Sequence, residues 1–118
     1  DPDAVERLVA AAIAPGSTIT GIYNAGAGNR GLLRALKGRS LQRPAVVVHE
    51  LSQTTRMGIE TGLIDAVIDQ KPDDEIAMAL GHLRALADAK PCKARALAPA
   101  IYMQDNLPDE AEMEGNTP

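Results

Sequence analysis

The chain has 118 residues, a formal net charge of −4 and one cysteine, Cys92. A chain of this length is one small domain or one lobe of a larger one, one cysteine forms no internal disulfide, and no apolar run approaches the ~20 residues that span a bilayer. Two tyrosines, no Phe or Trp and no net positive charge argue against a nucleic-acid-binding module, which combines basic surface with stacking aromatics.

The net charge is concentrated at the carboxyl end of the chain. Residues 109–118 contain four acids and no base, so 12 acids and 12 bases remain in residues 1–108. This apolar-poor tail is predicted to be disordered, and residues 1–108 to fold as one unit. A basic run inside that unit is interpreted as a solvated helix face and loop, with a phosphate or partner contact as the alternative. The run comprises Arg30, Arg34, Lys37, Arg39 and Arg43.

Helices and strands are predicted to alternate in the first half of the chain. Asp1-Pro2 suits the start of an amphipathic helix that ends at Pro15-Gly16. Residues 19–23 predict a buried strand, and leucines at helical spacing predict a helix that ends at Gly38. Residues 44–49 then form the continuous apolar run that is typical of a strand in a parallel sheet.

The alternation continues in the second half. Ser52 is predicted to cap a helix that reaches about residue 61, and residues 63–69 read as a third strand. Pro72 and the acids after it suit the start of a further helix. The apolar stripe of that helix predicts burial of Ile76, Ala79, Leu80, Leu83 and Leu86. Residues 96–103 predict a proline-interrupted strand at an edge or hinge.

These elements predict an α/β fold with a mostly parallel sheet and helices on both faces. The first predicted element is a helix, and its apolar stripe needs a sheet to pack on. We therefore expect a strand that precedes this sequence, and we expect the chain to be a piece of a longer protein.

Polar residues stand at the carboxyl ends of the predicted strands, where ligands collect in parallel α/β sheets. The first strand leads to Asn24, the second to Glu50 and the third to Gln70. Together they predict a ligand site whose amides and carboxylate suit a polyhydroxylated small molecule. Each residue also has a structural alternative: a turn for Asn24, a charge at a helix entry for Glu50, and a solvated loop for Gln70.

The loop after the first strand contains the dinucleotide-binding spacing, with Gly26, Gly28 and Gly31 followed by Glu50 at the expected distance. An NAD-dependent oxidoreductase is therefore an alternative. Against it, Asn24-Ala25 separates the glycines from the strand, and a helix precedes the unit. Because the two histidines and the cysteine also lack metal-ligand spacing, we expect neither enzyme activity nor a cofactor or metal.

Four stretches resemble the C-terminal lobe of the ligand-binding domain of LacI/GalR-type transcription regulators: "GIYNAGAGNRGLLRAL", "HELSQTTR", "GLIDAVIDQKP" and "DNLP". The resemblance covers residues 1–108. That domain is similar to the type I periplasmic sugar-binding proteins, in which a sugar is held between two hinged α/β lobes. A periplasmic sugar-binding receptor of an uptake system is therefore an alternative to the regulator.

The resemblance implies an effector that is a sugar or a derivative, bound by Asn24, Gln70 and Glu50, where many relatives have Asp. It implies a cytoplasmic homodimer that reads operator DNA through an N-terminal helix-turn-helix domain outside this sequence. No membrane contact is implied. The strand order of the family, 2-1-3-4-5 within a lobe, makes the first three predicted strands neighbours.

Overall fold

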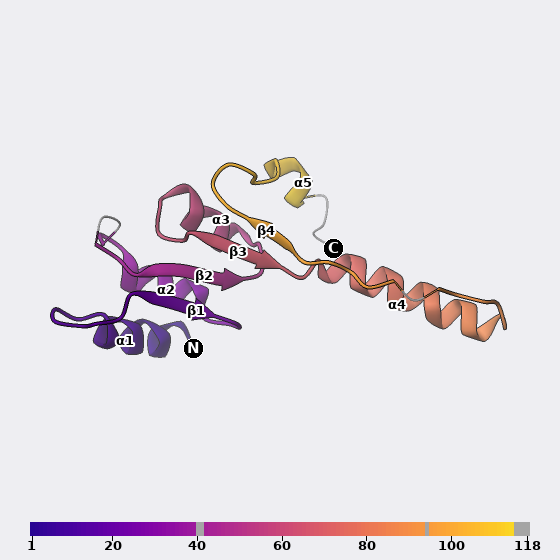
Figure 1. Ribbon diagram of the computed structural model, residues 1–118, viewed down its shortest axis with the longest axis horizontal. Helices are drawn as coiled ribbons and strands as arrows, with labels where there is room; N and C mark the ends of the chain where they lie inside the picture. The colour runs from indigo at the N-terminus through magenta and orange to yellow at the C-terminus, as the bar shows by residue number, and fades with distance from the viewer. Residues whose placement is uncertain (40–41, 94, 115–118) are drawn as a thin grey trace.

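The computed structural model describes residues 1–39, 42–93 and 95–114 (Figure 1). Helices and strands alternate along the chain as the sequence predicts. The elements are α1 (Pro2–Ala12), β1 (Gly21–Asn24), α2 (Asn29–Leu36), β2 (Ala45–His49), α3 (Gln53–Glu60), β3 (Ala66–Asp69), α4 (Pro72–Ala87), β4 (Ala100–Tyr102) and α5 (Glu110–Glu114).

The four strands form one sheet in the order β1-β2-β3-β4. β1, β2 and β3 are parallel neighbours, and β4 pairs with β3 in the antiparallel direction at the sheet edge. The mostly parallel α/β fold, the adjacency of the first three strands and the edge position of the last are therefore confirmed. β1 forms the opposite edge and pairs only with β2 among the described residues.

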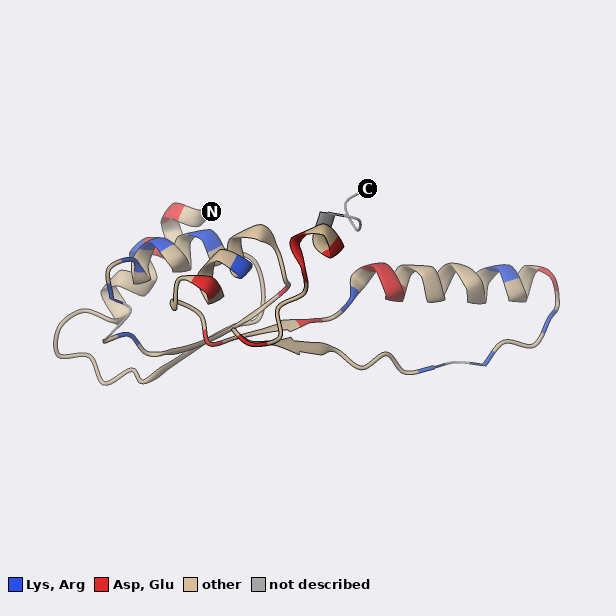
Figure 2. Cartoon of the chain, turned by 90° about the horizontal axis from the view of Figure 1, so that it is seen from above, with Lys and Arg blue, Asp and Glu red and all other residues tan. Residues whose placement is uncertain are grey.

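The hydrophobic core lies between one face of the sheet and helices α1, α2 and α3 (Figures 1 and 2). Val46, Val48 and Val67 alternate with outward residues along their strands and are fully buried. Leu36 from α2 and Ile59 from α3 complete the contact and are equally inaccessible. This packing fixes the three parallel strands against one another, and with them the positions of the loops that follow each strand.

Local capping chemistry sets the start and end of α3. The Ser52 side chain accepts a hydrogen bond from the Thr55 backbone N–H, and the Thr55 hydroxyl accepts one from the Ser52 N–H. This reciprocal pair satisfies two amides that a helix start leaves without intrahelical partners. Gly62 follows the helix at φ 76°, a left-handed conformation that favours glycine. The helix predicted to begin after Ser52 is therefore confirmed.

The second face of the sheet carries no helix among the described residues, in contrast to the predicted cover on both faces. Strand register places Tyr23, Val47, Ile68 and Ile101 on this open face. Tyr23 and Ile101 are mostly exposed. His49 lies on the same face, where its Nε2 forms a 2.5 Å hydrogen bond with the Tyr23 hydroxyl.

The predicted burial of the α4 stripe is also wrong. α4 has no buried residue and projects from the carboxyl end of the sheet, and residues 88–93 and 95–99 return alongside it to β4 (Figure 1). We call α4 and this return segment the arm. Lys71, at φ 53°, turns the chain away from the sheet immediately before α4. The arm gives the molecule its long dimension, with principal extents of 61 × 26 × 22 Å.

The acidic tail is described as far as residue 114, and residues 115–118 lie outside the described part. Residues predicted to be disordered include α5, which is tied to α3 by Arg56. The Arg56 guanidinium donates to the Pro108 carbonyl and contacts the Met113 sulfur, and its Nε pairs with Glu60 at 2.9 Å. Arg56 therefore holds the beginning of the tail over the carboxyl ends of the strands.

Candidate functional site

Parallel pairing brings the ends of β1, β2 and β3 to the same edge of the sheet. Asn24 is in register with Val48, and His49 is in register with Ile68. The residues that follow these positions therefore line one rim, as the sequence predicts. Strands in a sheet lie about 4.8 Å apart, so side chains from adjacent strand ends can reach one small ligand.

Glu50 occupies this rim in an unusual backbone conformation. Its φ is 72°, in the left-handed region that residues with a Cβ rarely adopt. The conformation is held from both sides: the Glu50 N–H donates to the Ile68 carbonyl at 2.9 Å, and the Glu50 carbonyl accepts from the Thr55 hydroxyl at 2.8 Å. Thr55 is fully buried. Strain that is maintained in this way clusters at active sites and ligand sites.

A hollow of about 620 Å³ lies beside Glu50, at the carboxyl ends of β2 and β3. Its volume falls within the range of small-molecule sites. Glu50 and Asp69 enter it from the strand ends, Ser52 and Gln53 from the start of α3, and Asp73 from the start of α4. The remaining walls come from Leu51, Pro72, Tyr102, Pro108, Glu112 and Met113.

The hollow is electrostatically negative. Four carboxylates line it, and no Lys, Arg or His is among the described residues of the lining. One Asp69 oxygen accepts a hydrogen bond from the Leu51 N–H at 3.4 Å, which fixes the carboxylate at the rim. Carboxylate oxygens accept hydrogen bonds, and Tyr102 adds an aromatic surface. This combination suits a ligand with several hydroxyl donors and an apolar face.

The three predicted site residues take different positions. Glu50 lines the hollow, whereas Asn24 and Gln70 do not. The Asn24 amide nitrogen donates to the Asn29 side chain at 2.6 Å and its oxygen accepts from the Gly26 N–H at 3.4 Å. Asn29 in turn donates to the His49 carbonyl at 3.1 Å, so Asn24 anchors the loop after β1 to the end of β2. Gln70 is exposed beside the hollow.

Sequence reasoning did not select Asp69 and Ser52, which line the hollow. A usable signal for Asp69 was present, because strand side chains alternate between the two faces. Asp69 lies two residues after the fully buried Val67 and therefore on the helix-covered side, where the hollow opens. Ser52 was predicted only as the cap of α3, and the structure shows that it also lines the hollow.

Helix α1 occupies the space beside two of the three loop glycines, Gly28 and Gly31. A Cβ placed on Gly31 would lie 2.1 Å from the Pro2 carbonyl oxygen, and one on Gly28 would lie 2.7 Å from the Val5 side chain. Gly28 is also the N-cap of α2 at φ 100°. The second and third glycines thus allow α1 to cross closely over the start of α2. Since α1 takes the space beside these glycines, the geometry does not support the dinucleotide interpretation.

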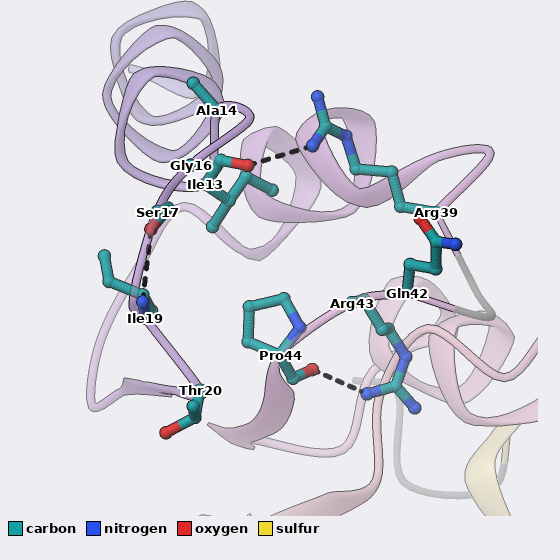
Figure 3. Close-up of a pocket in the computed structure, with 10 residues that line it drawn as sticks. All are labelled: Ile13, Ala14, Gly16, Ser17, Ile19, Thr20, Arg39, Gln42, Arg43 and Pro44. Atoms are coloured by element: carbon teal, nitrogen blue, oxygen red, sulfur yellow. Dashed lines mark hydrogen bonds between the residues drawn. The ribbon is translucent and has the colours of Figure 1, made fainter.

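A second hollow, of about 280 Å³, lies at the opposite, amino ends of the strands (Figure 3). Arg39 and Arg43 border it. The Arg39 guanidinium donates to the Ile13 carbonyl at 3.0 Å, and Arg43 donates to the carbonyls of Pro44 and Gly62. Both arginines therefore hold loops of the fold. Arg39 is exposed, in agreement with the predicted solvated face and loop, whereas the Arg43 side chain is largely buried.

Arg43 also forms a two-pronged ion pair with Asp65. Its two terminal nitrogens lie 2.7 and 2.9 Å from the two Asp65 oxygens, and one of these oxygens accepts from the Val46 N–H at 2.7 Å. Hydrogen bonding to Arg43, followed by the Val46 amide, holds the pKa of Asp65 below its usual value despite partial desolvation. The pair joins the start of β2 to the start of β3.

The described ranges contain neither a metal-binding cluster nor a membrane-spanning helix. No group of three or more His, Cys, Asp or Glu side chains there is arranged to hold a metal ion. Among the helices of residues 1–39, 42–93 and 95–114, none has the length and apolar character needed to cross a membrane.

Comparison with known proteins identifies the fold. No protein-family model and no curated protein sequence matches the chain. Among solved structures, it is similar to GanP, a glucose-galactose binding protein from Geobacillus stearothermophilus. The TM-score is 0.78 at 13% identity, over 92% of this chain and 40% of GanP. It is also similar to a chain of the XylFII-LytSN complex, with a TM-score of 0.73 at 16% identity, over 87% of this chain and 37% of that one.

The chain thus spans about two-fifths of the length of the structures that it matches. At this level of identity the likeness concerns the fold. Neither match is a LacI/GalR-type regulator. The chain has an α/β fold with a mostly parallel sheet, and this fold resembles one lobe of the periplasmic binding proteins.

Proposed function

We propose that the chain is a sugar-binding lobe of a larger receptor, and that the hollow at the carboxyl ends of β2 and β3 receives the sugar. The observation that carries this proposal is the convergence of Glu50, Asp69, Ser52 and Gln53 on one hollow beside parallel strand ends. Ligands bind at this end of parallel α/β sheets because loops and helix N-termini meet there. A sugar hydroxyl that donates to a carboxylate forms a charge-assisted hydrogen bond.

The fold supports the ligand class. One solved structure with this fold is named a glucose-galactose binding protein, and it aligns with nearly all of this chain. Because the chain corresponds to about two-fifths of that protein, the remaining contacts to the sugar are proposed to come from a second part of the receptor. Binding to this lobe alone is then weak, with Kd in the millimolar range, where a free energy of about −4 kcal/mol is sufficient.

Individual residues have distinct proposed roles. Glu50 and Asp69 accept hydrogen bonds from sugar hydroxyls, and Tyr102 packs against an apolar face of the ring. Asn24 acts through Asn29 by positioning the loop after β1. Gln70 is next to the rim and reaches a ligand that extends beyond the hollow.

The test is a titration of the ¹⁵N-labelled chain with galactose, glucose and xylose, followed by NMR. We expect the amide signals of Glu50, Leu51 and Asp69 to shift with at least one sugar at millimolar concentration. Glu50→Gln and Asp69→Asn should each weaken binding about tenfold, because a hydrogen bond to a charged group is worth about 1.5 kcal/mol or more. Asp105→Asn, an exposed carboxylate outside the lining, is the control. Equal weakening by the control variant, or the absence of shifts with every sugar, contradicts the proposal.

The second candidate is the effector-binding half of a LacI/GalR-type regulator. It is favoured by the "HELSQTTR" stretch, which in this structure provides Glu50, Ser52 and Gln53 to the hollow. This candidate adds a cytoplasmic location, a homodimer and operator DNA bound by a helix-turn-helix domain. Fractionation of the source cells with an antibody to this chain separates the two: cytoplasmic protein supports the regulator, and periplasmic or surface-bound protein supports the receptor.

A further inference from the structure

The segment after Pro108 forms part of the wall of the hollow beside Glu50. Glu112 and Met113 of α5 line this hollow, although the sequence pattern predicts a disordered tail. With five residues, α5 is far below the ~12–15 residues at which an isolated helix becomes marginally stable in water. Its position therefore depends on contacts with the rest of the molecule.

Arg56 of α3 supplies the polar contacts that hold this segment. Its Nη1 donates to the Pro108 carbonyl and lies 3.3 Å from the Met113 sulfur. In the part of the chain that the structure describes, every hydrogen bond between the 108–113 segment and the remaining residues comes from this guanidinium. The Arg56 side chain is 14% exposed, and the bond from its Nε to Glu60 fixes its orientation. One preoriented side chain thus acts as a latch.

Apolar packing contributes little beyond Leu107. Leu107 packs against the hydrophobic core and anchors the chain up to this point. Residues 109–112 are exposed, and Met113 is half-buried and lies outside the core. The 109–113 segment can therefore leave the hollow when the Arg56 contacts are lost, without opening the core.

Electrostatic repulsion opposes the latch. Glu112 enters a hollow that three other carboxylates already line, those of Glu50, Asp69 and Asp73. α5 and the first turn of α4 both carry acids (Figure 2). Like charges repel over a distance of about 8 Å at physiological salt. The closed position of the segment therefore depends on a balance between the Arg56 contacts and this repulsion.

We propose that residues 109–113 are a lid that closes over a sugar in the hollow, with Arg56 as its latch and Glu112 as a ligand contact. The inference rests on the proposed sugar site and adds a moving part to it. A sugar whose hydroxyls donate both to Glu112 and to Glu50 or Asp69 replaces repulsion between carboxylates by charge-assisted hydrogen bonds. Only the closed lid offers Glu112, so the sugar binds the closed state more tightly and shifts the equilibrium toward it. Arg56 lies outside the lining and is a positioning residue.

The first experiment measures the motion of the lid in the ¹⁵N-labelled 118-residue chain without sugar. Arg56→Gln removes the latch, and Met113→Ala removes its contact on the lid while Arg56 and Glu60 stay in place. Both variants should lower the heteronuclear ¹H–¹⁵N NOE of residues 110–113 toward the values of a mobile chain. Met113→Ala keeps the test decisive if Arg56→Gln impairs folding. Arg30→Gln, at an exposed arginine outside this hollow, is the control and should leave the NOE unchanged.

The second experiment adds galactose, glucose or xylose to the same samples. A sugar that shifts the amide signals of Glu50 and Asp69 should also raise the NOE of residues 110–113 in the wild-type chain. Glu112→Ala should raise the Kd for that sugar about threefold to tenfold, because a hydrogen bond to a charged group is lost. Glu110→Ala removes the same charge from the same short helix at a position outside the lining, and it should leave the Kd unchanged.

The outcomes distinguish the lid from the sugar site. An unchanged NOE in both latch variants refutes the latch, and an unchanged Kd in Glu112→Ala refutes the ligand contact. A sugar that shifts Glu50 and Asp69 but leaves residues 110–113 unaffected supports the site and overturns the lid. Tighter binding after loss of the latch also overturns it, because the segment would then exclude the sugar. If none of the three sugars shifts any amide signal, the proposed function itself fails, and the lid fails with it.

Discussion

Gly31→Ala tests the conclusion that the glycine loop serves helix packing. The new methyl group would lie 2.1 Å from the Pro2 carbonyl oxygen and 3.0 Å from the Val5 Cβ. Because the closest atom belongs to the backbone, helix α1 has to move away from α2. Overpacking of this kind costs about 1–3 kcal/mol or more. Because the 2.1 Å contact is with backbone, we take the cost as about 3 kcal/mol; the better helix propensity of alanine offsets about 1 kcal/mol of it, which leaves a net loss of about 2 kcal/mol in the free energy of unfolding.

The assay is urea unfolding followed by circular dichroism, with hydrogen exchange of the α1 amides as a local measure. The loss corresponds to a fall in Tm of about 4–8 °C per kcal/mol. Gly26→Ala is the matched control, because a Cβ at that position meets no atom within 4 Å, and its effect should stay within about 0.5 kcal/mol. If Gly31→Ala is as stable as Gly26→Ala and α1 stays protected, the packing argument fails and a ligand role for the glycines has to be reconsidered.

Three further substitutions test the contacts around the rim and the sheet. Thr55→Val should cost about 2 kcal/mol in urea unfolding, because the buried hydroxyl bonds the Glu50 carbonyl and the Ser52 amide; Thr55→Ser keeps the hydroxyl and should lose less. Glu50→Gly should raise the free energy of unfolding by up to about 1 kcal/mol, since glycine adopts φ 72° without strain; a loss would show that Glu50 is not strained. Asp65→Asn should cost about 1 kcal/mol at pH 7. The folded-state pKa of Asp65 is lowered, so its contribution is present above the unfolded value near 4 and is lost as the pH falls through the folded value. The wild-type chain should therefore lose more stability than Asp65→Asn between pH 5 and pH 2, and parallel pH profiles would contradict the role of the pair.

The sequence was informative wherever the partner of a residue lies nearby in the chain. The Ser52 cap and the parallel direction of the first three strands follow from local patterns and from the helices that connect them, whereas the order of these strands was implied by the family resemblance. The position of Glu50 at the rim follows from the local patterns as well. These features depend on periodicity and capping, which act over a few residues. The predicted burial of the first strand is wrong, because β1 is an edge strand without a buried residue.

The failures occur where the partner is distant. The stripe of α4 correctly indicates an apolar face, but periodicity does not specify which surface covers it. Likewise, the spacing of Gly28 and Gly31 indicates close approach by some group, and it cannot distinguish a bound pyrophosphate from helix α1. At the third strand end, a difference of one residue between Gln70 and Asp69 decides which side chain lines the hollow.

The arm also has a consequence for the order of folding. β1, β2 and β3 are linked by crossovers of about 20 and about 16 residues, each with a helix packed on the sheet. In contrast, β4 pairs with β3 only after an excursion of about thirty residues, from Asp69 to Ala100. Closing a flexible loop of that length costs about 3 kcal/mol in chain entropy, and a strand of three residues offsets little of it. The three parallel strands should therefore assemble first and β4 should join last. Tyr102 and Pro108 arrive with β4, so the hollow beside Glu50 acquires its final wall only at the end of folding.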